Sequence, residues 1–68
     1  MRLIVNGELK ELAPEPPTLS NLINLLDYHP KLIVVEYNGC ILPPSHWNTQ
    51  QIKDEDSIEI VTIVGGGS

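Results

Sequence analysis

The chain has 68 residues, of which nine are acidic and four basic, for a formal net charge of -5. A chain of this length forms one small domain and buries only about 60% of the surface that its unfolded form exposes, so an internal catalytic cleft is not expected. The acidic balance disfavours nucleic acid as a partner. A single cysteine, no signal-peptide pattern and no apolar run near the roughly 20 residues of a membrane span predict a cytoplasmic protein without a membrane partner.

The first residues predict a β-hairpin. Asn6-Gly7 is a strong signal for a tight turn, and it lies between the apolar run 3–5 and residues 8–12. Leu9 and Leu12 do not alternate strictly, so we expect the second strand to be short or bulged. A cluster of prolines at positions 14, 16 and 17 ends it.

One amphipathic helix is predicted over about residues 19–28. Thr18 is a suitable N-cap, and His29-Pro30 ends the helix because a residue before proline disfavours the helical conformation. Four apolar residues recur at the spacing of one buried helical stripe: Leu19, Leu22, Ile23 and Leu26.

A second hairpin follows, with a β-branched run over 32–37, a turn at Asn38-Gly39 and a short return strand over 40–42. A single helical turn near 45–47 and an acidic turn at 54–57 then precede the final strand, 58–64. These elements predict an α+β fold of ββαββ order with a short insertion before the final strand. One helix packs on one face of a mixed sheet in a domain spanning 1–64, and 65–68 form a flexible tail.

The final strand is apolar in both of its phases near the C-terminus. We expect Ile58, Ile60 and Val64 to face the helix, and Val61 and Ile63 to lie on the open face as a docking patch beside the tail. The alternative is that neighbouring side chains or a loop cover Val61 and Ile63. The nearby acidic residues either steer a basic docking surface or form a solvated turn; they are Asp54, Glu55, Asp56 and Glu59.

The other side chains do not occur at the spacings that metal-binding, nucleotide-binding or catalytic motifs require. We expect His29 and His46 to be structural, because they are isolated from other ligand types. Cys40 lies in an apolar stretch and is expected to be a small buried core residue rather than a nucleophile. Trp47 is expected to clamp its loop. The sequence therefore predicts no cofactor and no catalytic activity of its own.

The C-terminal segment, Gly65-Gly66-Gly67-Ser68, carries the remaining chemistry. Glycine lacks a Cβ, so this backbone can extend through a narrow channel, and four extended residues reach roughly 13 Å. A carboxylate is a poor electrophile and must be activated by a partner, for example by adenylation with ATP, before sulfur or an amine displaces the leaving group. The chain is then substrate and carrier together.

Several motifs occur in a characteristic order along the chain: Asn6-Gly7, Thr18-Leu19-x-x-Leu22-Ile23, Tyr37-Asn38-Gly39, Pro43-x-x-x-Trp47, and Asp54-x-Asp56 leading through Ile58-Glu59-Ile60-Val61 to the glycines. Over essentially its whole length the chain resembles the ThiS sulfur carriers of thiamine biosynthesis, in the β-grasp, ubiquitin-like group. The resemblance implies that a ubiquitin-activating-type enzyme adenylates the terminal glycine. It also implies that a persulfide donor supplies sulfur and that the thiocarboxylate delivers it to thiazole synthase. Gly66 and Gly67 are the positions carried over.

Ser68 departs from the family pattern, which ends in Gly-Gly. Either a protease removes Ser68, or the activating enzyme accepts it, or Gly-Gly-Gly-Ser is partly an added flexible linker. We favour removal, because a Cβ and a hydroxyl would crowd a channel fitted to glycine. Three alternative functions remain open: a molybdopterin-type sulfur carrier, a ubiquitin-like modifier that forms isopeptide bonds, and a non-catalytic β-grasp interaction module.

Overall fold

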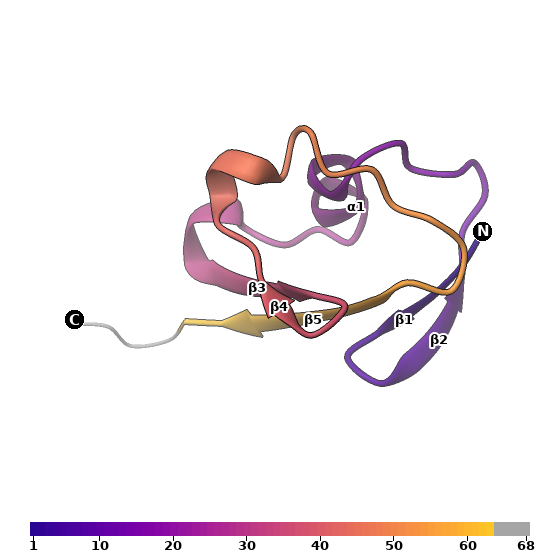
Figure 1. The fold of residues 1–68 in the computed structure, drawn as a ribbon, viewed down its shortest axis with the longest axis horizontal. Coiled ribbons are helices and arrows are strands. Elements are labelled where there is room, and N and C mark those ends of the chain that lie inside the picture. The colour runs from indigo at the N-terminus through magenta and orange to yellow at the C-terminus, as the bar shows by residue number, and fades with distance from the viewer. Residues whose placement is uncertain (64–68) are drawn as a thin grey trace.

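The computed structural model describes residues 1–63, and within them five strands form one mixed sheet with an α-helix on one face (Figure 1). The predicted boundary at residue 64, Val64 itself and the predicted tail, Gly65 to Ser68, lie outside the described residues. The elements in chain order are β1 (Arg2–Val5), β2 (Glu8–Glu11), α1 (Leu19–Leu25), the 3-10 turn η1 (Pro30–Leu32), β3 (Ile33–Tyr37), β4 (Cys40–Ile41), the 3-10 turn η2 (Pro44–His46) and β5 (Ser57–Thr62).

The sheet has the strand order β2-β1-β5-β3-β4. β5 runs parallel to β1 and antiparallel to β3, while β1–β2 and β3–β4 are antiparallel hairpins. The return strand predicted for the second hairpin is present as β4, which has only two residues. The last strand in the sequence thus lies in the middle of the sheet, where both hairpins contact it.

Both predicted hairpin turns are confirmed, and their backbone explains their sequence. Asn6 and Gly7 have φ values of 51° and 80°, and Asn38 and Gly39 have φ values of 50° and 88°. Two successive residues with positive φ match the twist of the flanking strands, and asparagine and glycine adopt this conformation with little strain.

The helix begins as predicted but ends earlier. Thr18 caps it, because its Oγ1 accepts a hydrogen bond from the Asn21 N–H at 3.3 Å. The helix ends at Leu25 rather than at residue 28, since Asp27 adopts a left-handed conformation with a φ of 65°. The Tyr28 N–H then bonds to the Ile23 carbonyl at 3.2 Å, which is the arrangement of a Schellman C-cap.

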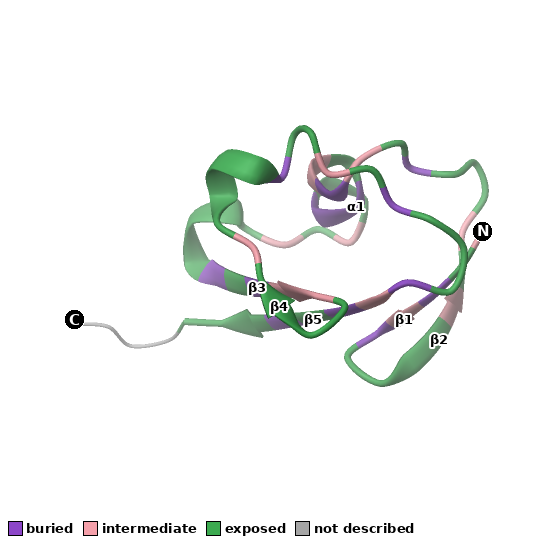
Figure 2. Ribbon diagram, in the orientation of Figure 1, coloured by how far each residue is buried: buried purple, intermediate pink, exposed green. Residues whose placement is uncertain are grey.

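The core lies between α1 and one face of β1, β3 and β5 (Figure 2). Trp47 closes it from the loop side: the residue is 4% exposed, and its Nε1–H donates to the Leu42 carbonyl at 2.8 Å. The predicted clamp is therefore confirmed. The buried apolar residues are Leu3, Val5, Leu19, Leu22, Ile23, Ile33, Val35, Trp47, Ile52, Ile58 and Ile60.

The prediction that Cys40 is buried is wrong, because Cys40 is exposed. It belongs to β4, the strand at one edge of the sheet, and both residues of β4 are exposed. The apolar run 40–42 resembles a core strand in sequence, but only Leu42 packs partly against the core. None of the helices in residues 1–63 is long and apolar enough to cross a membrane.

Candidate functional site

Two of the predicted docking residues, Val61 in β5 and Ile63 just after it, lie on the face of the sheet opposite the helix. Ile58 and Ile60 are 0% and 5% exposed and belong to the core, whereas Val61 and Ile63 are 59% and 51% exposed. The predicted alternation is confirmed for these four residues. About half of the surface of Val61 and of Ile63 is open to solvent, so the described residues do not cover these two side chains.

The exposed apolar surface continues onto β3 and the residue before it. Val34 of β3 pairs directly with Val61, and the Ile63 N–H donates to the Leu32 carbonyl at 2.6 Å. Both Val34 and Leu32 are themselves exposed, at 38% and 47%. We call the four residues Leu32, Val34, Val61 and Ile63 the apolar patch. The sequence did not identify Leu32 and Val34, because their partner strand was unknown; the register of β3 on β5 reveals them.

Two glutamates border the apolar patch. Glu36 and Glu59 are directly opposite each other on β3 and β5, one alternation step from the Val34–Val61 pair and therefore on the same face. The ion pairs formed within residues 1–63 are those of Met1 with Glu15 and of Arg2 with Glu11, so neither glutamate takes part in one. Like charges directly opposite each other on a sheet are destabilising. A cationic group of a partner would relieve this repulsion.

The predicted site residues Asp54 and Asp56 lie away from the apolar patch, in the turn that precedes the first residue of β5. Asp56 is only 7% exposed. Its carboxylate accepts hydrogen bonds from the Tyr37 hydroxyl, from Asn38 Nδ2 at 3.2 Å and from the Lys53 N–H at 2.8 Å. The structure therefore brings Glu59 together with Val61 and Ile63, but not Asp54 or Asp56. Asp56 fastens the chain before β5 to the β3–β4 hairpin.

The pKa values of buried Asp56 and partly buried Tyr37 are both shifted. Burial raises the pKa of the Asp56 carboxyl, but the hydrogen bonds from Tyr37, Lys53 and Asn38 outweigh it, and the net pKa lies below its ordinary value. Burial, the hydrogen bond to Asp56 and its negative charge raise the pKa of Tyr37 to about 12. Near neutral pH the pair is thus a carboxylate that accepts from a neutral phenol.

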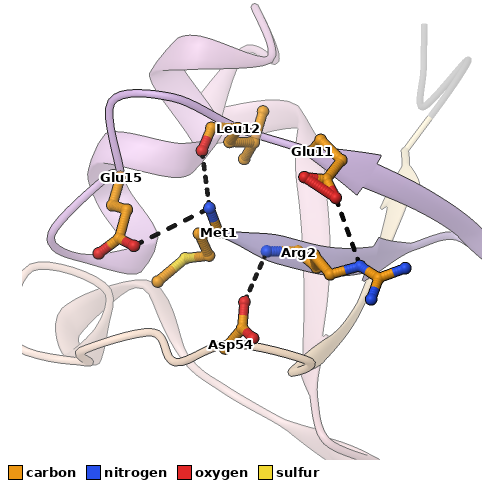
Figure 3. A network of polar contacts seen from close by, with 6 residues as sticks. All are labelled: Met1, Arg2, Glu11, Leu12, Glu15 and Asp54. Carbon is orange, nitrogen blue, oxygen red and sulfur yellow. Dashed lines mark hydrogen bonds and ion pairs between the residues drawn. The ribbon is translucent and has the colours of Figure 1, made fainter.

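Asp54 and the N-terminus form a separate network of polar contacts (Figure 3). The Arg2 backbone N–H donates to Asp54 Oδ1 at 2.7 Å, and Arg2 Nε lies 3.3 Å from Glu11 Oε1. The Met1 amino group donates to the Leu12 carbonyl at 3.0 Å and lies 3.9 Å from Glu15 Oε2. The Arg2–Asp54 bond, with a bond from the Glu55 N–H to the Arg2 carbonyl at 2.6 Å, holds the acidic turn against β1. The other contacts tie the start of β1 to the end of β2 and the loop after it.

Comparison of the sequence with known proteins identifies the family of this chain. The model of the ThiS family matches residues 3–67. The chain belongs to the ThiS family. It is 31% identical over 65 residues to the sulfur carrier protein ThiS of Bacillus subtilis, a match that covers 96% of this chain and 98% of that protein. It is also 34% identical over 68 residues to the thiazole synthase of Paramagnetospirillum magneticum, covering all of this chain and 21% of that protein.

The fold agrees with a solved ThiS structure. The crystal structure of the thiamine biosynthesis protein ThiS from Geobacter metallireducens matches with a TM-score of 0.85 and 28% identity, covering 98% of this chain and 100% of that one. The predicted α+β β-grasp fold is confirmed. Membership of the ThiS family also confirms the prediction of a sulfur carrier of thiamine biosynthesis, which other enzymes act on and which is not itself a catalyst.

The residues predicted to react lie outside residues 1–63, the part of the chain that the structure describes. One residue, Val64, separates the apolar patch from the segment Gly65, Gly66, Gly67 and Ser68, and the family match extends through Gly67. In residues 1–63 we find no cavity and no group of His, Cys, Asp and Glu that could hold a metal ion. The candidate site of the described part is therefore a surface, which consists of the apolar patch with Glu36 and Glu59.

Proposed function

We propose that the chain carries sulfur as a thiocarboxylate on Gly67 and donates it for thiazole formation in the cytoplasm. The supporting observation is the position of the apolar patch: in a chain of the ThiS family, the exposed residues Val61 and Ile63 are separated from the glycine segment by Val64 alone. A protein that docks on the patch would find the terminal carboxylate within roughly 13 Å of the folded domain.

The chemistry requires a partner at each step. The Gly67 carboxylate attacks the α-phosphate of ATP in an adenylating enzyme of the ubiquitin-activating type and displaces pyrophosphate, which gives an acyl adenylate. The terminal sulfur of a protein persulfide then attacks the acyl carbon and expels AMP, and a thiol reduces the resulting acyl disulfide to leave the thiocarboxylate. Because Ser68 would block this carboxylate, its prior removal belongs to the proposal, and Gly66 lets the terminus enter a narrow site.

We propose thiazole synthase as the partner that accepts the sulfur. The thiazole synthase of Paramagnetospirillum magneticum contains a region similar to this whole chain, so a ThiS-like region is part of a thiazole synthase polypeptide there. The docking surface would be the apolar patch, with Glu59 and Glu36 facing cationic side chains of the partner. Asp54 and Asp56 would not take part in docking, because the structure uses them to hold the chain that precedes β5.

An intact-mass experiment tests the carrier chemistry. Two forms of the chain, one ending at Gly67 and one at Ser68, are incubated with ATP, a ThiS-adenylating enzyme and a persulfide donor. We expect the form ending at Gly67 to gain the mass difference of one oxygen-to-sulfur exchange, and the form ending at Ser68 to stay unchanged. A Gly67→Val variant of the shorter form is the control for crowding at the reacting residue. An unchanged mass in both forms would contradict the proposal, and a mass shift caused by linkage to a lysine would favour the modifier instead.

A further inference from the structure

The C-terminal half of β5 has a neighbouring strand on only one side. β1 pairs with β5 at Ile4–Ser57 and Val5–Ile58 and ends at Val5, whereas β3 pairs with β5 as far as Thr62. In Figure 1 the end of β5 extends away from the β1–β2 hairpin. One edge of β5 is therefore left without a neighbouring strand from residues 1–63 after the contact with β1 ends.

The hydrogen bonds show which backbone groups face this open edge. On the β3 side, the Ile63 N–H donates to Leu32, and the Ser57 carbonyl accepts from Asn38 at 2.7 Å. On the β1 side, the Ile58 carbonyl accepts from the Asn6 N–H at 2.9 Å. Because successive residues of a strand point their backbone groups to opposite sides, Thr62 points its N–H and C=O away from β3 and along the open edge.

Asn6 marks the point at which the ladder stops. Its backbone turns away with a φ of 51°, and its side-chain Oδ1 accepts the Ile60 N–H at 2.7 Å. The asparagine side chain thus takes the place of the next residue of a strand. The Thr62 N–H is the next outward donor of β5, and it lies four residues beyond Ile58, the last residue of β5 that pairs with β1.

The other two edges of the sheet are protected and this one is not. Natural proteins guard an exposed strand edge with charged residues, proline or a very short strand. β2 has the sequence Glu8-Leu9-Lys10-Glu11, and β4 has two residues with Pro43 soon after. The segment Ile60–Ile63 contains none of these devices, since it consists of three apolar residues and one threonine. An unguarded edge in a chain that guards its other edges points to a binding role.

We infer that this open edge, from Ile60 to Ile63, binds an extended backbone segment of thiazole synthase, which adds to the sheet as a strand beside β5. Free backbone donors and acceptors at the strand spacing recognise another extended backbone, and the alternating side chains Val61 and Ile63 would add specificity. The added strand would end where residues 64–68 begin, so it would fix the direction in which the terminus leaves the domain. The inference rests on the proposed function, which supplies this partner.

Amide hydrogen exchange of Thr62 tests the inference directly. In the free chain the Thr62 amide should exchange rapidly, while the Ile60 amide, bonded to Asn6 Oδ1, should already be slowed. On addition of thiazole synthase, we expect the exchange of the Thr62 amide to slow by about tenfold or more, the effect of a newly formed hydrogen bond. A complex in which the Thr62 amide stays fast would overturn the strand addition but leave the partnership intact.

A proline substitution gives a second, independent test. Thr62→Pro removes a backbone N–H that β3 does not use, and proline is accepted in strands where its missing N–H faces outward. We expect Thr62→Pro to weaken binding to thiazole synthase by about tenfold or more, the loss of one hydrogen bond with added steric hindrance. Thr62→Val, which keeps the N–H and the branched side chain, should bind as the unchanged chain does.

The remaining outcomes separate the inference from the proposed function. Equal binding of Thr62→Pro and Thr62→Val would overturn the strand addition, and if Thr62→Pro fails to fold, the exchange measurement on the unchanged chain still decides. A Thr62 amide that is protected in the free chain and loses this protection on dilution would show that a second copy occupies the edge, which also contradicts the inference. Absence of any complex with thiazole synthase would remove the proposed partner itself.

Discussion

The two ends of β5 have opposite environments. The chain entering β5 is held on several sides: Asp56 is buried and accepts three hydrogen bonds, and Asp54 is bonded to the backbone of β1. The chain leaving β5 is exposed at Val61 and Ile63 and has an open edge at Thr62. One strand therefore combines an anchor with a presentation surface. A carrier needs both, because the terminus must be offered to partners from a domain that stays folded.

The largest effect should come from breaking the anchor. We expect Asp56→Ala to lower the free energy of unfolding by about 3 kcal/mol, because it removes the acceptor of Asn38 Nδ2 and of the Lys53 N–H. The Tyr37 hydroxyl loses one of its two acceptors and keeps the Gln51 carbonyl at 3.2 Å. Urea denaturation measures this loss. The matched control is Asp54→Ala, which removes one exposed hydrogen bond and should cost less than about 1 kcal/mol. Equal losses would contradict the conclusion that buried Asp56 contributes more to stability than exposed Asp54.

Changes at the exposed end should affect binding and leave the fold stable. Val61→Thr and Ile63→Thr keep the branched shape and reduce the apolar surface, so we expect the double variant to bind thiazole synthase about tenfold more weakly. Its free energy of unfolding should change by less than about 1 kcal/mol, since both side chains are exposed. Ile41→Thr, at an exposed apolar position on β4, is the control and should bind normally. Unchanged binding by the double variant would exclude the apolar patch as the docking surface.

The anchor should also make stability depend on pH at both extremes. The folded pKa of Asp56 is lowered, so its contribution is present above its ordinary pKa of 3.8 and is lost as the pH falls through the folded value. The folded pKa of Tyr37 is raised to about 12. Its contribution to stability is therefore complete below the ordinary pKa of 10.0 and is lost as the pH rises through the folded pKa of about 12. Asp56→Asn should flatten the acid limb of urea midpoints against pH, and Tyr37→Phe the alkaline limb. Limbs as steep as those of the unchanged chain would exclude this pair as the cause.

The smallest effect concerns the opposed glutamates. Glu59→Gln removes the repulsion from Glu36, so we expect it to raise the free energy of unfolding by about 0.5 kcal/mol. The same change should slow association with the partner and reduce the salt dependence of the association rate. Glu8→Gln, on β2, removes one charge elsewhere and is the control in stopped-flow measurements. If both variants slow association equally, net charge rather than the Glu36–Glu59 pair steers docking.

The parts of the fold that depend on local chemistry could be predicted from the sequence. Asn6-Gly7 and Asn38-Gly39 need positive φ values that few other residue pairs accept, so both turns were identified. Val61 and Ile63 were placed on the open face because strand periodicity alone separates them from Ile58 and Ile60. In each case the neighbouring residues in sequence determine the outcome.

The parts that depend on distant residues could not be predicted. Asp54 and Asp56 stand in the same acidic turn, and only the contacts of Asp56 with Tyr37 and Asn38, 19 and 18 positions away, make it an anchor. The predicted burial of Cys40 is wrong because its exposure follows from the edge position of β4 in the sheet. The helix α1 ends early because Asp27 adopts the left-handed conformation at its C-terminus. Glycine occupies such a position more often than aspartate, so the sequence does not signal the helix end.

The intact mass of the protein isolated from its own cells tests the central claim most directly. The account predicts a chain that ends at Gly67, without Ser68, in which part of the population carries sulfur in place of one terminal oxygen. Alkylation of the thiocarboxylate before isolation preserves this species. A population that ends uniformly at Ser68 with an unmodified carboxylate, in cells that are actively making thiamine, would contradict the account.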